Sequence, residues 1–334
     1  MFTTYFNETH EEARRNIRRF VERHVTPHIN EWEEAGTFPR EIYKLAGDAG
    51  ILGIGYPEEF GGNSEGDYFM SLVATEELLR AGSGGFFSSL MSHGIALPPI
   101  AKWASAEMKA RIVPEVLSGD KIIALAVTEP GGGSDVANLK TRAVDCGDHY
   151  KVSGSKTYIT SGIRADYYTV AVRTGGEGYG GISMLLIEKG TPGFTTGQPL
   201  KKMGWWCSDT AELFFDNVVV PKSNLIGIEN GGFMMIMTNF EAERLGLACY
   251  SNTLSELALN EALAYAKNRS TFGKPLSKHQ VIRHKLADMA TQLEASREFT
   301  YRVAARMQAG KPALKEVSMA KNFATKTSDF ITYE

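Results

Sequence analysis

A glycine-rich turn near the middle of the chain carries the groups that can hold a phosphate. It reads TEPGGGSD at residues 128–135 and follows an apolar run, residues 122–125, that predicts a short buried strand. Glycine-rich turns leave backbone N–H groups uncovered, and an anion can approach them closely. The hydroxyls of Thr128 and Ser134 flank the turn and can donate or accept hydrogen bonds. A mobile surface loop is the alternative explanation for three glycines taken alone.

A second motif, GSKTYITSG at residues 154–162, has the pattern of a strand with Tyr158 and Thr160 on the same face. A tyrosine and a threonine two residues apart can stack on a flat ring and form a hydrogen bond with its edge. The same two residues would also make an ordinary cross-strand pair in a sheet. From this string alone, the cross-strand pair is the better explanation.

A third motif, NRSTFGK at residues 268–274, offers another way to hold phosphate. An arginine beside a serine and a threonine can bind a diphosphate through two N–H groups. An arginine at the end of a helix is also common as a surface residue that complements the helix dipole. Both interpretations of Arg269 stay open at the level of the residues.

One carboxylate stands on an otherwise apolar helical stripe. The stripe steps by four and three residues through Ile236, Phe240, Glu243, Leu247, Tyr250 and Leu254. Burial raises the pKa of a carboxyl group because it penalises the charged form, and a raised pKa suits a general base that works near neutral pH. A glutamate at the rim of the core, paired with Arg244 or Lys267, explains the pattern equally well.

Together these strings resemble the acyl-CoA dehydrogenase family, in the family's order and over nearly the whole chain. The turn is similar to the family's Thr-Glu-Pro-Gly-x-Gly-Ser-Asp flavin loop. The second motif is similar to Lys-x-Trp-Ile-Thr-Asn-Gly, in which the aromatic residue covers the isoalloxazine and the threonine bonds near flavin N5. Thr160 matches, whereas Tyr158 and Ser161 replace tryptophan and asparagine. Residues 202–213 resemble a Met-Gly-x-x-x-Ser-x-Thr loop, and we expect their two tryptophans to serve packing.

The resemblance implies FAD as the cofactor and indicates its contacts residue by residue. The expected FAD contacts are Ala126, Thr128, Ser134, Tyr158, Thr160, Arg269, Thr271, Phe272, His279 and Gln280. In the family's Arg-x-x-Phe-Gly motif the arginine reaches the FAD diphosphate across a subunit interface, which implies a homotetramer or homodimer. The expected substrate contacts are Ser134, Phe240, Glu241 and Arg244.

The resemblance also implies a reaction, the α,β-dehydrogenation of a fatty acyl-CoA thioester. Most of the family has its base near the C-terminus, in a Tyr-Glu-Gly segment, but isovaleryl and long-chain members have a glutamate directly before the arginine that Arg244 matches. Glu243 is therefore the expected catalytic base, whereas Glu129 is expected to support the turn. The electrons would pass to an electron-transferring flavoprotein.

Two other functions stay open. An acyl-CoA oxidase or a flavin monooxygenase on the same fold would pass electrons to oxygen, and a truncated family member would act only as a binding module. The chain stops inside a predicted helix, before the family's C-terminal Gly-Gly segment. We therefore expect a C-terminally truncated chain that lacks part of the cofactor and thioester sites.

The elements that must position these residues predict an α+β fold of three domains. These are an N-terminal helical domain (1–120), a middle β-barrel or sandwich-like domain (121–228) and a C-terminal helical bundle (229–334). Periodicity predicts N-terminal helices at 9–25, 39–50, 63–82, 86–101 and 103–117, and C-terminal helices at 233–268, 278–308 and from 313 onward. Predicted strands lie at 122–125, 141–145, 150–153, 157–160, 167–173, 182–188 and 211–220.

Composition narrows the possible partners. The 334 residues include 36 basic and 39 acidic side chains, a net charge of −3, which gives no case for binding nucleic acid or an anionic membrane. No apolar stretch approaches the ~20 residues of a membrane span. The 3 cysteines show neither a metal spacing nor a disulfide framework. We therefore expect a cytoplasmic protein without a metal.

Overall fold

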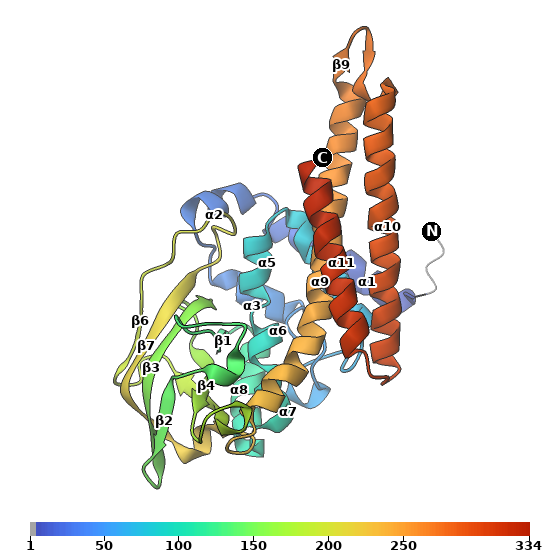
Figure 1. Ribbon diagram of the computed structural model, residues 1–334. Coiled ribbons are helices and arrows are strands. Elements are labelled where there is room, and N and C mark those ends of the chain that lie inside the picture. The colour runs from blue at the N-terminus through green and yellow to red at the C-terminus, as the bar shows by residue number, and fades with distance from the viewer. Residues whose placement is uncertain (1–4) are drawn as a thin grey trace. The chain divides into compact units, whose positions relative to one another are not determined.

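The computed structural model describes residues 5–334, which divide into two compact units (Figure 1). The first, which we call the bundle unit, contains residues 5–26, Gly66–Gly82 and Glu241–Glu334. The second, the sheet unit, contains Pro27–Glu65 and Ser83–Phe240. Helices precede and follow a central sheet in the chain, so the α+β prediction is confirmed.

The sheet unit is built on eight strands within the described residues. They are β1 (Ile123–Ala126), β2 (Arg142–Asp145), β3 (His149–Thr160), β4 (Tyr167–Arg173), β5 (Ile182–Glu188), β6 (Phe194–Thr196), β7 (Thr210–Pro221) and β8 (Leu225–Ile226). Their order in the sheet is β6-β7-β3-β2-β4-β5-β8, and β1 pairs in parallel with β4. Residues 150–153 and 157–160, predicted as two strands, form the single strand β3, because register shifts opposite β7 absorb the irregular stretch between them.

Six whole α-helices lie in the described part of the sheet unit. They are α2 (Ile29–Ala35), α3 (Glu41–Asp48), α5 (Gly84–Leu90), α6 (His93–Ala96), α7 (Pro98–Trp103) and α8 (Ala106–Leu117). The prediction of one helix over residues 86–101 is wrong, since α5, α6 and most of α7 share this stretch. Pro98 has no N–H to donate to Gly94, so helical hydrogen bonding is interrupted between α6 and α7. Before α6, the Ser92 hydroxyl donates to the Ile123 carbonyl at 3.1 Å and ties the chain to β1.

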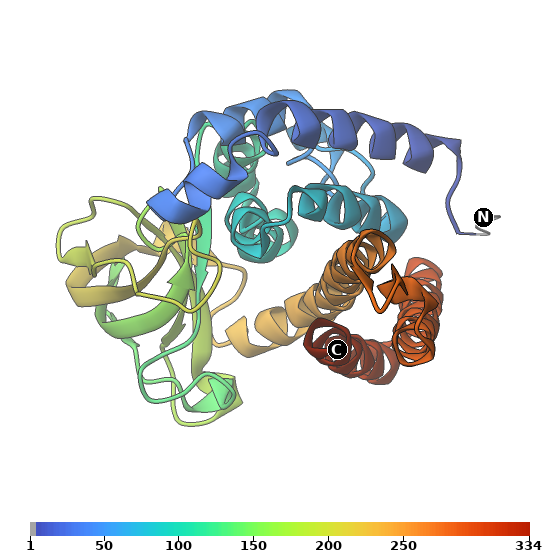
Figure 2. The same ribbon diagram turned by 90° about the horizontal axis from the view of Figure 1, so that it is seen from above.

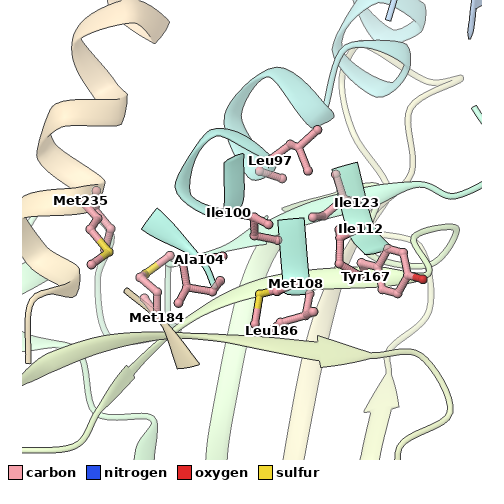
Figure 3. Packing of buried hydrophobic residues seen from close by; sticks show 14 of the residues in the cluster. Leu97, Ile100, Ala104, Met108, Ile112, Ile123, Tyr167, Met184, Leu186 and Met235 are labelled. Carbon is pink, nitrogen blue, oxygen red and sulfur yellow. The ribbon is translucent and has the colours of Figure 1, made fainter. Parts of the chain in front are cut away.

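The core of the sheet unit joins these helices to the sheet. Buried side chains of α7 and α8, such as Ile100 and Ile112, share one cluster with Ile123 of β1 and Leu186 of β5 (Figure 3). Met235, near the start of α9 (Gly232–Asn268), extends the same cluster. Burying a side chain of this size contributes ~1.5–3 kcal/mol. The core therefore holds β1 firmly at the point where it leads into the glycine-rich turn.

The bundle unit is helical, apart from a small two-stranded hairpin. Its helices are α1 (Glu8–His24), α4 (Tyr68–Leu78), the greater part of α9 (Gly232–Asn268), α10 (Gln280–Gln308) and α11 (Leu314–Tyr333), and its strands are β9 (Ser270–Thr271) and β10 (Lys274–Pro275). Figures 1 and 2 show α10 and α11 side by side. Asn252 of α9 links to α10 by donating to Thr300 at 3.0 Å and accepting from Ser296 at 2.6 Å. No helix within residues 5–334 is both long and apolar enough to cross a membrane.

Candidate cofactor and active site

The glycine-rich turn leaves β1 and closes on itself. The N–H of Glu129 donates to the Gly132 carbonyl at 3.2 Å, and the N–H of Gly132 donates back to the Glu129 carbonyl at 3.0 Å. The next three N–H groups, those of Gly133, Ser134 and Asp135, donate to no other residue that the structure describes. All three residues lie on the surface. This stretch can therefore offer successive N–H groups to an anion.

Glu129 supports the turn from inside the protein. Its carboxylate is buried and accepts the N–H groups of Lys140 at 2.6 Å and Thr141 at 2.8 Å. The ammonium of Lys156, fully buried on β3, donates to Glu129 Oε1 at 2.8 Å and to the Val127 carbonyl at 3.0 Å. Burial opposes ionisation of Glu129, but Lys156 and the other donors outweigh it and lower the pKa of the carboxyl group. Burial also lowers the pKa of Lys156, against the opposing effect of Glu129.

A hydrogen bond joins the turn to the second motif. The N–H of Thr157 donates to the Thr128 carbonyl at 2.9 Å. The Thr128 side chain lies against Gly133, where an added Cβ would be 3.1 Å from its Cγ2. Tyr158 follows Thr157 directly, and Thr160 is half-buried two residues further along β3. Thr128, Tyr158 and Thr160 thus belong to adjoining segments of the sheet unit.

Tyr158 is both exposed and strained. Its side chain is 70% exposed, and its φ of 58° lies in the left-handed region, inside the register shift of β3. This region costs a residue with a side chain ~1–2 kcal/mol, and such strain often marks a functional position. An exposed aromatic face beside an anion-binding turn can stack on a flat ring. Ala126, by contrast, is fully buried, so only its backbone can reach a ligand.

The third motif forms a hairpin between α9 and α10 in the bundle unit. Phe272 and Gly273 make its turn, with φ of 53° and 75°, and Phe272 is 96% exposed. His279 lies near Thr271, with its Nε2 3.2 Å from the Thr271 carbonyl oxygen. Arg269 is exposed and forms no ion pair among residues 5–334. Gln280, also exposed, is the first residue of α10.

Glu243 lies on α9 in the bundle unit and is half-buried. Burial raises the pKa of its carboxyl group, and the charge of Arg244 opposes this shift only in part. The carboxylate forms no hydrogen bond or ion pair with any described residue, so neither Arg244 nor Lys267 pairs with it. A half-buried, unpaired carboxylate with a raised pKa can act as a general base.

The expected substrate contacts are divided between the two units. Phe240 packs on the core of the sheet unit, whereas Glu241 and Arg244 belong with Glu243 to the bundle unit. Ser134, also expected at the substrate, lies in the sheet unit. Glu241 is two residues from Glu243, or about 200° around the helix.

Trp205 and Trp206, expected to serve packing, are 43% and 53% exposed, and the backbone of Trp205 lies against Gly85. One residue of the site region is missing from the sequence analysis. Lys156 was not among the predicted residues, although it anchors Glu129. The sequence gives no signal for this pair, because Lys156 stands between the polar residues Ser155 and Thr157.

Three protein-family models match consecutive parts of the chain. They are described as "Acyl-CoA dehydrogenase, N-terminal domain" at residues 7–120, "middle domain" at residues 124–218 and "C-terminal domain" at residues 230–333. Together they account for most of the chain.

Individual relatives and solved structures agree with these models. An acyl-CoA dehydrogenase of Bacillus subtilis is 38% identical over 313 residues, which are 93% of this chain and 82% of the relative. The long-chain specific acyl-CoA dehydrogenase of mouse mitochondria is 36% identical over 332 residues, 98% of this chain and 77% of the relative. The crystal structure of a probable acyl-CoA dehydrogenase from Mycobacterium abscessus is 50% identical with a TM-score of 0.96, and the match covers 98% of this chain and 87% of that one.

Proposed function

The chain belongs to the acyl-CoA dehydrogenase family of oxidoreductases, and from that premise we propose that it desaturates a fatty acyl-CoA thioester between Cα and Cβ with FAD as its cofactor. Bound FAD supplies the acceptor for the β-hydride. The protein's own residues hold the ring and the diphosphate, take the α-proton and exclude water.

The main support for this function is that the glycine-rich turn and the second motif are hydrogen-bonded to each other in the sheet unit. Residues 133–135 offer N–H groups next to Thr128, and Thr128 is hydrogen-bonded to the segment that exposes Tyr158. An anion site beside an exposed aromatic face fits a cofactor in which a diphosphate is linked to a flat ring. One similar structure, a glutaryl-CoA dehydrogenase of Mycobacterium smegmatis that is 27% identical, is a complex with FADH2.

We assign the roles within this site as follows. The turn with Ser134, and the hairpin with Arg269, would hold the phosphates. Tyr158 would cover the isoalloxazine, and Thr160 would bond near flavin N5. The remaining expected FAD contacts are Ala126, Thr128, Thr271, Phe272, His279 and Gln280. Glu243 would remove the α-proton, and Phe240, Glu241 and Arg244 would contact the substrate.

The proposal extends to partners and compartment. Electrons would leave to an electron-transferring flavoprotein, and a similar structure, 35% identical, is described as the "Electron transferring flavoprotein of Acidaminococcus fermentans". The active form would be a homotetramer or homodimer. The three cysteines are free, which fits a reducing compartment, and we propose the cytosol. The similar mouse enzyme is mitochondrial.

The test is the visible spectrum of the purified protein. We expect a yellow holoenzyme whose flavin absorbance bleaches when a saturated acyl-CoA is added without oxygen, with a rate that depends on chain length. An electron-transferring flavoprotein should then reoxidise the reduced enzyme faster than oxygen does. A protein that takes up no FAD would contradict the cofactor, and a yellow protein that no acyl-CoA bleaches would contradict the reaction.

A further inference from the structure

A glutamate of α2 lies at the centre of a hydrogen-bond cluster that the proposed reaction does not use. Glu33 accepts the Ser83 hydroxyl, the Cys207 N–H at 3.1 Å and the Cys207 thiol at 3.3 Å. Burial opposes ionisation of Glu33, but these donors outweigh it and lower the pKa of the carboxyl group. Burial also raises the pKa of the fully buried Cys207 thiol to about 12, so the thiol donates and the carboxylate accepts.

The cluster fastens the loop of residues 202–209 to helices of the same unit. Ser83 also caps α5, because its hydroxyl accepts the N–H of Phe86 at 2.9 Å. Gly85 packs so closely on Trp205 that an added Cβ would lie 2.9 Å from the Trp205 Cα. Trp205 has a φ of 58°. A residue with a side chain keeps this left-handed conformation only where its surroundings hold it.

The other end of the loop holds the strand that carries Tyr158 and Thr160. The N–H of Ser161 donates to the Asp209 carbonyl at 3.0 Å, and the N–H of Ile163 donates to Asp209 Oδ2 at 2.7 Å. Ser161 is fully buried and left-handed, with a φ of 60°. Two strained residues, Tyr158 near the end of β3 and Ser161 directly after it, therefore lie in this segment, and hydrogen bonds to Asp209 hold the segment in place.

We propose that Glu33 is a positioning residue for the flavin-binding end of β3. It anchors Cys207, which sets the place of Asp209, and Asp209 sets the conformation of residues 158–161. This inference rests on the proposed function, since it takes Tyr158 and Thr160 to contact FAD. Glu33 itself contacts no reacting group. Its ionised form is required because every partner is a donor, whereas an amide would direct its own N–H groups at some of them.

The principal test compares Glu33→Gln with Glu34→Gln. Glu34 is the exposed neighbour on α2, and its side chain forms no hydrogen bond among the described residues. For Glu33→Gln we expect FAD affinity at least tenfold below that of the parent and a shift of the flavin absorption bands. Glu34→Gln should keep both at parent values. A role in stability alone would lower the unfolding temperature and leave the spectrum of the bound flavin unchanged.

Trypsin supplies a readout that needs no flavin. Lys201, directly before the loop, is exposed, so loosening of the loop should speed cleavage after Lys201 and Lys202 in the apoprotein. Mass spectrometry would locate the cut, and we expect a rate several-fold above that of Glu34→Gln. Should Glu33→Gln fail to fold, Cys207→Ala removes one donor and should shift the flavin bands in the same direction, while Cys207→Ser restores a donor and the parent spectrum.

The outcomes separate this inference from the proposed function. A parent protein that takes up no FAD overturns both. A parent that binds FAD, with Glu33→Gln equal to it in FAD affinity and flavin spectrum, overturns only the role of Glu33, even if trypsin cleaves the loop faster. A flavin spectrum of Cys207→Ala equal to that of the parent would likewise overturn only the role of Glu33.

Discussion

Glu243 lacks the ion pair that would make it an ordinary glutamate at the rim of a core. The carboxylate is half-buried with a raised pKa, and it forms no hydrogen bond with any described residue. We predict that Glu243→Gln keeps the fold, bound FAD and acyl-CoA binding but loses flavin reduction. A general base contributes ~10²–10⁴-fold to the rate, so the rate of anaerobic flavin bleaching should fall by at least ~10²-fold.

Glu261→Gln is the matched control for this variant. It makes the same chemical change at an exposed glutamate of the same helix that is not among the expected site residues. Its bleaching rate should stay near that of the parent. If Glu243→Gln bleached at the parent rate, the base would be another residue.

The raised pKa of Glu243 also predicts how the reaction responds to pH. Only the ionised carboxylate can accept the α-proton, so the rate should rise with pH and level off above the pKa of the group. Because burial raises that pKa above the usual 4.5, half of the maximal rate should be reached at a pH above 4.5. Stopped-flow measurement of flavin reduction across the acidic range checks this, and a rate independent of pH there would contradict it.

At the scale of elements, the buried pair of Glu129 and Lys156 joins the glycine-rich turn to β3. Removing one partner of a buried pair leaves an unpaired charge and typically costs ~3–5 kcal/mol. We predict a loss of this size in the free energy of unfolding for Lys156→Met, measured by denaturant titration. Lys140→Met is the control, since only the backbone of this exposed residue contacts Glu129.

A double variant tests whether the cost arises from the unpaired charge. Adding Glu129→Gln to Lys156→Met removes the remaining charge, and the amide oxygen can still accept an N–H from Lys140 or Thr141. The double variant should therefore be more stable than Lys156→Met alone. Additive losses would show that the two side chains do not interact.

At the scale of the whole molecule, the expected FAD contacts are divided between the sheet unit and the hairpin of the bundle unit. If Arg269 completes the site of a second subunit, FAD binding and assembly are coupled. We predict that Arg269→Ala lowers FAD retention and weakens the oligomer together, measured by flavin absorbance and analytical ultracentrifugation. Arg283→Ala, at an exposed arginine of the adjoining α10, should change neither. A monomeric holoenzyme with full activity would exclude the role across subunits.

Patterns within single segments were enough to predict much of this protein. The strands at 167–173 and 182–188 were predicted with the bounds that β4 and β5 have, because β-branched and aromatic residues concentrate there. The helices at 233–268 and 278–308 agree with α9 and α10 to within two residues at each end. The family could be identified for the same reason, since each flavin motif is a short contiguous string. The roles of the site residues remain predictions.

Contacts between distant residues were decided only by the tertiary structure. Lys156 donates a hydrogen bond to Glu129 because the turn after β1 folds against β3. Glu33 accepts the N–H of Cys207, which is 174 residues away in the sequence. Periodicity reports which face of an element is buried, but not which donor or acceptor another element brings to that face. The left-handed backbone of Tyr158 also depends on the tertiary structure, because no strand pattern predicts a positive φ. It lies in the register shift between β3 and β7, and contacts from other segments hold it there.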